Sequence, residues 1–193
     1  MRSVLAAFVL VSSASLANAQ AANPGFSAPD QKAQSNDEND FNNADHLFVR
    51  LLTIGGKSEV DLGLLAAERA TAESTKSFAK QMANDHSAGN LRLAAIVKKT
   101  ALQKVPETDP AHQDLHRRLG DLRDKAFDHA YLGAQVDEHI RTAQILAWEI
   151  GAGQNAELKK FAADTLPTVL AHLQHAQDLV SGSSVDLAET KVK

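Results

Sequence analysis

The 193-residue chain has no cysteine and only one tryptophan and one tyrosine. Without cysteine it forms no disulfide and offers no thiolate to a metal, and a lipoprotein anchor is not expected. A basic excess is also missing, because 20 Lys and Arg stand against 24 Asp and Glu, for a formal net charge of −4. Nucleic acid and anionic lipid surfaces are therefore not expected as partners.

Long apolar runs are missing as well. A bilayer span takes about 20 apolar residues, and the apolar stretch from Val4 to Val11 is much shorter. It follows Arg2 and precedes the small-residue site Ala17-Asn18-Ala19, which is the pattern of a cleaved secretory signal peptide. We predict a signal peptide over residues 1–19 and a soluble product in the periplasm.

The composition at the two ends of the remaining chain differs from that of its middle. Residues 20–44 are rich in Asn, Gln, Ser, Pro and Asp, and they contain only two large apolar side chains, Phe26 and Phe41. Such a segment buries too little apolar surface to order itself, so we predict a flexible lead. The same composition predicts a flexible tail over residues 181–193, which leaves residues 45–180 as one domain.

Within this domain, apolar residues recur at steps of four and three, and no alternating strand pattern is present. This periodicity indicates helices that pack in a bundle. Short connections within the first and second helix pairs make each pair antiparallel, so we predict an all-α, up-down four-helix bundle. The predicted long helices cover about residues 44–69, 72–101, 121–151 and 156–180.

Local chemistry marks the helix ends. Thr71 is predicted to cap the second long helix and Asn155 the fourth, after Gly151 and Gly153 end the third. In the long connection between the second and third helices, Asp109-Pro110 predicts the start of a short extra helix that ends near Gly120.

Each long helix carries one ionisable residue on its apolar face. These residues are Glu59, His86, His139 and His172. At a helical rise of about 1.5 Å per residue, Glu59 and His86 share a level, because they are almost equally far from the turn between their helices. His139 and His172 lie level or about one turn apart by the same rise, and Pro167 is expected to kink the last helix near His172.

Three imidazoles and one carboxylate suit a divalent transition metal. Neutral imidazole binds Zn or Fe well, and one carboxylate offsets half of the charge of the ion. The hypothesis is therefore one Zn, Fe or Mn ion bound by these four residues, with Asp85 and Glu138 at the rim as hydrogen-bond acceptors for the histidines. The alternative is a structural network without a metal, in which Glu59 accepts a hydrogen bond from His86.

The remaining polar residues of interest have simpler interpretations. His129 is predicted to lie on the flank of its helix, and Asp128 is expected to form a structural hydrogen bond with Tyr131. Four further histidines are expected to be solvated surface residues: His46, His112, His116 and His175.

Four stretches of the bundle resemble an exported bacterial family known as domain of unknown function 4142. They are "SEVDLGLLAAERA" (58–70), "KSFAKQMANDHSAGNLRL" (76–93), "FDHAYLGAQVDEH" (127–139) and "KKFAADTLPTVLAHLQHA" (159–176). The resemblance implies a ferritin-like four-helix bundle and supplies no established activity. Members are often labelled predicted outer membrane proteins, but without a strand pattern in this chain we predict the periplasm.

A ferritin-like fold invites comparison with di-iron enzymes, which place a Glu-x-x-His pair on each of two helices. No glutamate of this chain is followed three residues later by histidine, so that chemistry is not expected. No nucleophile triad, phosphate-binding glycine loop or paired-carboxylate motif is present either, and enzymatic activity stays open.

Two functions remain. The first is a periplasmic metal-binding bundle that serves storage, sensing or redox protection. The second is a non-enzymatic envelope or stress protein that docks a partner and uses the Glu/His cluster only for structure. The identity of the metal, the partner and the oligomeric state are left open by the sequence.

Overall fold

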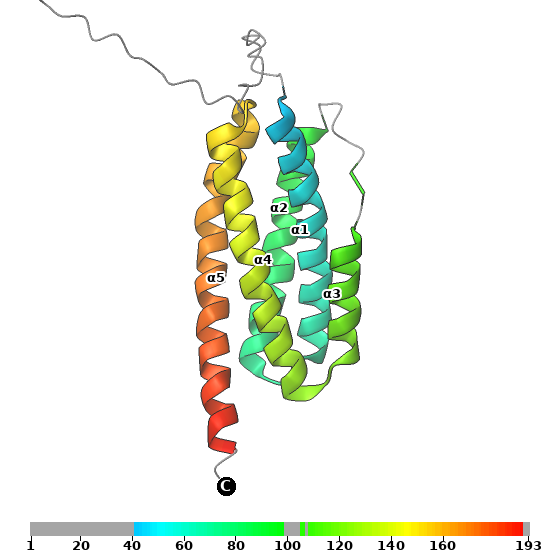
Figure 1. The fold of residues 1–193 in the computed structure, drawn as a ribbon, viewed down its shortest axis with the longest axis vertical. Coiled ribbons are helices and arrows are strands. Elements are labelled where there is room, and N and C mark those ends of the chain that lie inside the picture. The colour runs from blue at the N-terminus through cyan, green and yellow to red at the C-terminus, as the bar shows by residue number, and fades with distance from the viewer. Residues whose placement is uncertain (1–40, 99–104, 107, 191–193) are drawn as a thin grey trace, which may run out of the picture. The chain divides into compact units, whose positions relative to one another are not determined.

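The computed structural model describes residues 41–98, 105–106 and 108–190, with side chains up to residue 182. The predicted signal peptide and nearly all of the predicted lead lie outside these residues. The described part of the chain is all-α, as predicted, with four long helices and one short one (Figure 1). They are α1 (Asn43–Arg69), α2 (Glu73–Val97), α3 (Pro110–Asp121), α4 (Asp124–Ala152) and α5 (Ala156–Thr190).

Two antiparallel pairs, α1 with α2 and α4 with α5, form the bundle, and both pairs were predicted. Asp128, near the start of α4, accepts hydrogen bonds from the turn between α1 and α2, so α2 and α4 start at the same end of the bundle. The connection that contains α3 therefore returns the chain along the bundle before α4 begins (Figure 1). One such crossover is a feature of ferritin-like bundles.

The helix ends confirm two of the predicted caps and correct a third. Asp109 accepts from the backbone N–H of His112 at 2.9 Å, and Asn155 accepts from that of Leu158 at 3.0 Å. Thr71 does not cap α2, because the N-cap position is Ala72 and the Thr71 hydroxyl donates to Asp128 at 2.8 Å. The carboxylate from α4 thus bonds the turn that precedes α2, and the N-cap of α2 makes no side-chain hydrogen bond.

Several predicted boundaries shift: α2 ends at Val97 where 101 was predicted, and α4 starts at Asp124 where 121 was predicted. Helix α4 includes Gly151 and ends at Ala152, with Gly153 as its C-cap. Helix α5 continues through Pro167 to Thr190, ten residues beyond the predicted end at 180. The helix continues into polar residues, and the Ser181 hydroxyl donates to the carbonyl of Gln177 at 2.9 Å, one helical turn back.

Two apolar clusters fill the bundle and leave a polar layer between them. One surrounds the buried rings of Phe78, Phe127 and Tyr131, and the other contains Phe48 and Phe161. Along α1, α2, α4 and α5, the polar residues Glu59, His86, His139 and His172 fall between members of the two clusters. Among the helices of the described residues, none has the length and apolar character that crossing a membrane requires.

Candidate metal site

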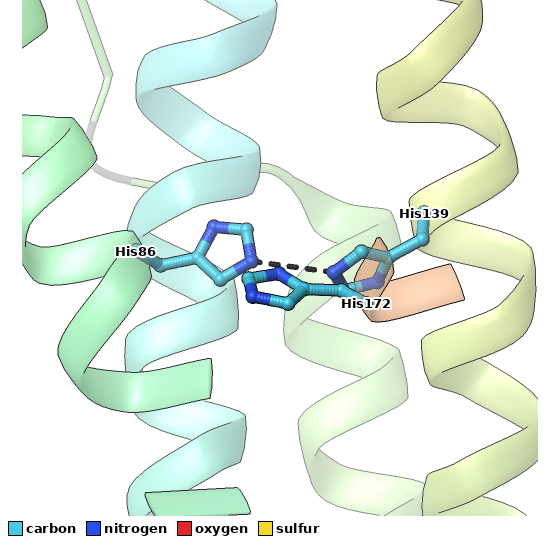
Figure 2. Close-up of side chains that lie close together, drawn as sticks. All are labelled: His86, His139 and His172. Atoms are coloured by element: carbon cyan, nitrogen blue, oxygen red, sulfur yellow. Dashed lines mark hydrogen bonds between the residues drawn. The ribbon is translucent and has the colours of Figure 1, made fainter. Parts of the chain in front are cut away.

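Three histidine rings meet in the polar layer, one each from α2, α4 and α5 (Figure 2). The Nε2 atoms of His86 and His139 lie 3.4 Å apart. One ring nitrogen from each of His86, His139 and His172 lies within 4.8 Å of the others. His172 therefore lies at the same level of the bundle as His86 and His139, and not one helical turn away.

The ring of His139 is fixed by its own helix. Its Nδ1 lies 2.9 Å from the carbonyl oxygen of Gln135, one turn earlier on α4. A carbonyl only accepts, so Nδ1 carries the proton and donates it. In the neutral ring, Nε2 then has a lone pair and no proton. This is the atom that faces His86.

The ring of His172 is fixed by a neighbouring helix. Its Nε2 lies 2.9 Å from Oδ2 of Asp85 on α2. An ionised carboxylate has no proton to give, so Nε2–H donates and Nδ1 keeps the lone pair. This Nδ1 is buried and has no hydrogen-bond partner among the described residues. A histidine whose second nitrogen donates to a carboxylate is the arrangement common at metal sites.

Burial keeps these histidines neutral. It lowers the pKa of His86 to about 3, and repulsion from the other two rings adds to the effect. It lowers the pKa of His139 to about 4 against the opposing effect of the bond to Gln135. The pKa of His172 is also lowered by burial, in part offset by Asp85. Neutral imidazole is the form that binds metals.

Glu59 lies in the same layer but outside the group that the three nitrogens form. Its Oε2 accepts a hydrogen bond from Nε2 of Gln135 at 2.7 Å, and not from His86 as the structural alternative proposed. Burial raises the pKa of Glu59 to about 7, although the bond to Gln135 opposes this. The carboxyl group is therefore ready to lose its proton when a positive charge arrives nearby.

An ion-paired rim lies outside this layer. Nε2 of His112 on α3 lies 3.7 Å from Glu138, and its Nδ1 lies 2.8 Å from Asp109. Glu138 and Asp109 together raise the pKa of His112 to about 9. The prediction of a solvated surface residue was therefore wrong for His112, which is half-buried and cationic.

The structure also corrects the expected bond between Asp128 and Tyr131. Asp128 is occupied by Thr71 and Ala72, and the Tyr131 hydroxyl has no hydrogen-bond partner among the described residues. His129 is exposed on the flank of α4, as predicted.

Sequence reasoning missed Gln135, which contacts both Glu59 and His139. The spacing of four residues between Gln135 and His139 was the available signal, since such residues share a helix face. Sequence reasoning placed Asp85 at the rim of the metal site. It did not predict the contact of Asp85 with His172, which comes from another helix.

The fold and site define a class: an all-α bundle with a buried group of three neutral histidines able to hold a metal ion. The chain belongs to the family described as Domain of unknown function (DUF4142), whose model matches residues 30–179. The comparisons with curated proteins and with solved structures found no match.

Proposed function

We propose that the protein binds one divalent transition metal ion through His86, His139 and His172, with Glu59 as the fourth ligand. The single observation that carries this proposal is the convergence of three imidazoles in the interior of the bundle. Two of them, those of His139 and His172, are buried and have their second nitrogen held by a hydrogen-bond acceptor. That arrangement leaves the lone pairs of His139 Nε2 and His172 Nδ1 for a ligand.

Distances in the group suit a small ion. Nitrogen ligands about 2.0–2.1 Å from a tetrahedral Zn²⁺ lie about 3.4 Å from one another. The Nε2 atoms of His86 and His139 are already 3.4 Å apart. Because His139 Nε2 has the lone pair, the proton between these two rings lies on His86 Nε2 in the metal-free protein. To complete the group, His86 moves this proton to Nδ1, and His172 approaches from within 4.8 Å.

Charge favours the same assignment. Three neutral imidazoles leave the full charge of a divalent ion in a buried layer, which is costly without an anion. Glu59 supplies one negative charge once it loses its proton, and Zn, Fe and Mn all accept mixed nitrogen and oxygen ligands. The bond from Gln135 holds this carboxylate in place beside the group.

Metal content and metal-dependent melting test the proposal. The protein is purified without a histidine tag, analysed for metals, and titrated with Zn²⁺ after chelation. Wild type should melt at a higher temperature with zinc, because a ligand at about 100 times its Kd adds about 2.7 kcal/mol of stability. His139→Ala should lose this gain, whereas His129→Ala, which changes an exposed histidine of the same helix, should keep it.

Glu59→Gln separates a ligand from a neighbour. If Glu59 and His139 share one ion, their losses of zinc affinity are non-additive in the double variant, whereas independent residues simply add. A wild-type protein that contains no metal and shows no melting shift would reject metal binding. The function to test next would then be the docking of an envelope partner by the bundle surface.

The compartment we propose is the periplasm. Support comes from the sequence of residues 1–19, which lie outside the described residues: Arg2, the apolar stretch from Val4 to Val11, and Ala17-Asn18-Ala19. Mass spectrometry of the protein from a periplasmic extract should show an N-terminus at Gln20. An intact Met1 would reject the cleavage.

A further inference from the structure

A pocket of about 170 Å³ lies beside the histidine group. Two of the three histidines drawn in Figure 2, His86 and His172, line this pocket, and so does Glu59. An ion held by these residues would therefore lie in the wall of the pocket and would not be sealed behind it.

The pocket connects this wall with the surface of the bundle, because its lining also includes the exposed residues Asp85, Arg141 and Thr168. Metal sites that serve only structure are closed by their protein ligands, whereas sites that act on a ligand keep a position open to it. The pocket gives the histidine group the access that a site of the open kind requires.

Two helical glycines leave space beside the proposed ligands. Gly89 follows His86 by three residues on α2, and Gly55 precedes Glu59 by four on α1, so each lies on the same helix face as a proposed ligand. Both glycines line the pocket, and a Cβ added at either position would meet nothing within 4 Å. A side chain at either position would therefore fill space that glycine leaves open beside the ion.

The charged residues of the lining decide which class of ligand fits. The carboxylates of Glu59, Asp85 and Glu138 line the pocket, together with the cations His112 and Arg141. When Glu59 is ionised, three negative and two positive charges leave the lining with one net negative charge. A divalent ion turns this into one net positive charge, which is costly inside the bundle unless an anion offsets it.

We propose that the bound metal ion takes a small monovalent anion as a further ligand, on the side that faces the pocket. This inference rests on the proposed metal site and names the class of ligand that the site binds. Four protein ligands leave room for a fifth, because zinc expands to five ligands and Fe²⁺ sites keep open positions. The pocket is far larger than a single water requires, so it holds an anion of a few atoms together with water.

The first experiment uses cobalt and azide. Co²⁺ takes ligands similar to those of zinc and absorbs visible light, so its spectrum reports a change of ligands. Azide should change the spectrum of the cobalt-loaded wild type saturably, with one azide per ion. Bound cobalt whose spectrum does not respond to azide would overturn the inference and leave the metal proposal standing, whereas a protein that binds neither cobalt nor zinc would reject both.

The second experiment fills the pocket from two helices. Gly89→Leu and Gly55→Leu should still bind cobalt but should raise the Kd of azide tenfold or more, because each leucine takes space beside the ion. Gly133→Leu is the matched control: it makes the same change inside α4, outside this pocket, where an added Cβ also meets nothing within 4 Å, and should bind azide like wild type. Wild-type azide affinity in both pocket variants would overturn the inference.

The third experiment asks whether the anion binds to the ion or to the cations of the lining. By calorimetry, azide should bind to zinc-loaded wild type and not to the metal-free protein. Equal binding to both forms would place the anion at His112 and Arg141 and would overturn the assignment to the metal ion.

Discussion

At the two ends of the bundle, the carboxylates of Asp45 and Asp128 are buried and fully bonded. Asp128 accepts from the backbone N–H of Thr71 at 2.9 Å and of Ala72 at 2.8 Å. Asp45 accepts from the backbone N–H groups of Gln154 and Asn155, both at 3.1 Å. Each aspartate, near the start of its own helix, thereby ties that helix to the connection between two others.

The middle of the bundle differs, because it keeps buried polar atoms that have no partner within the described residues. They include Gln135 Oε1, Thr165 Oγ1 and His172 Nδ1. A buried polar atom without a hydrogen bond costs free energy. The two aspartates at the ends therefore serve folding, whereas the middle holds groups whose cost a bound ion or molecule would offset.

The largest expected effect is the removal of an end carboxylate. Asp128→Ala removes a charged acceptor from the N–H groups of Thr71 and Ala72 and from the Thr71 hydroxyl. It should lower the free energy of unfolding by about 3 to 4 kcal/mol, because one hydrogen bond to a charged group contributes about 1.5 to 3 kcal/mol. In the metal-free protein, His139→Ala should cost less, about 1 to 3 kcal/mol, as an ordinary core truncation. The midpoints of urea denaturation measure both losses, provided that the slope of the unfolding free energy against urea concentration is the same in each protein.

The exposed Asp137 on α4 provides the matched control for Asp128, and Asp137→Ala should change stability little. Asp128→Asn keeps one acceptor oxygen and should recover part of the loss. Equal costs for Asp128→Ala and His139→Ala would break the distinction between ends and middle.

The sequence predicted the helices and the polar layer well because both follow from one periodicity. Glu59, His139 and His172 occupy apolar seams, and the structure buries all three. A residue on the seam faces the interior whatever its neighbours are, so its own helix is enough to predict its burial.

Hydrogen bonds between helices were harder to predict. The contacts of Asp85 with His172 and of Asp128 with Thr71 join residues 87 and 57 positions apart. They depend on how far each helix is rotated and shifted against the next, which periodicity leaves undetermined. The crossover between α2 and α4 belongs to the same class, because the length of a connection does not fix the end at which the next helix starts.

Tyr131 and Glu149 are exceptions toward the ends, and the pH dependence of Glu149 offers a smaller test. Glu149 is fully buried beside Asp45, yet neither of its oxygens has a hydrogen-bond partner in the described structure. Burial and the Asp45 carboxylate raise its pKa from 4.5 to about 8. The unfolded chain ionises first, so this residue makes the fold progressively less stable as pH rises from about 4.5 to about 8.

Glu149→Gln removes this titration and should gain stability relative to wild type over the same range. Urea denaturation midpoints at pH 5, 7 and 8.5 measure the difference in unfolding free energy between the two proteins. The contributions of the other titrating groups cancel in this difference. Parallel profiles would show that Glu149 does not titrate differently in the folded and unfolded states.

Glu59 provides the smallest test, in the middle of the bundle. Its pKa is raised from 4.5 to about 7, so in the metal-free protein its contribution to stability is lost as pH rises between these values and then stays constant. Glu59→Gln keeps an oxygen for the bond from Gln135, removes the charge, and should gain stability on wild type only within this narrower window. With zinc present the sign should reverse above pH 7, because a carboxylate that neutralises the ion stabilises the folded state and an amide does not. Melting temperatures of both proteins, with chelator and with zinc at pH 5.5 and 8, measure this reversal. If Glu59→Gln gains the same stability with and without zinc, Glu59 belongs with the structural carboxylates of the ends, and the metal site of the middle consists of the three histidines alone.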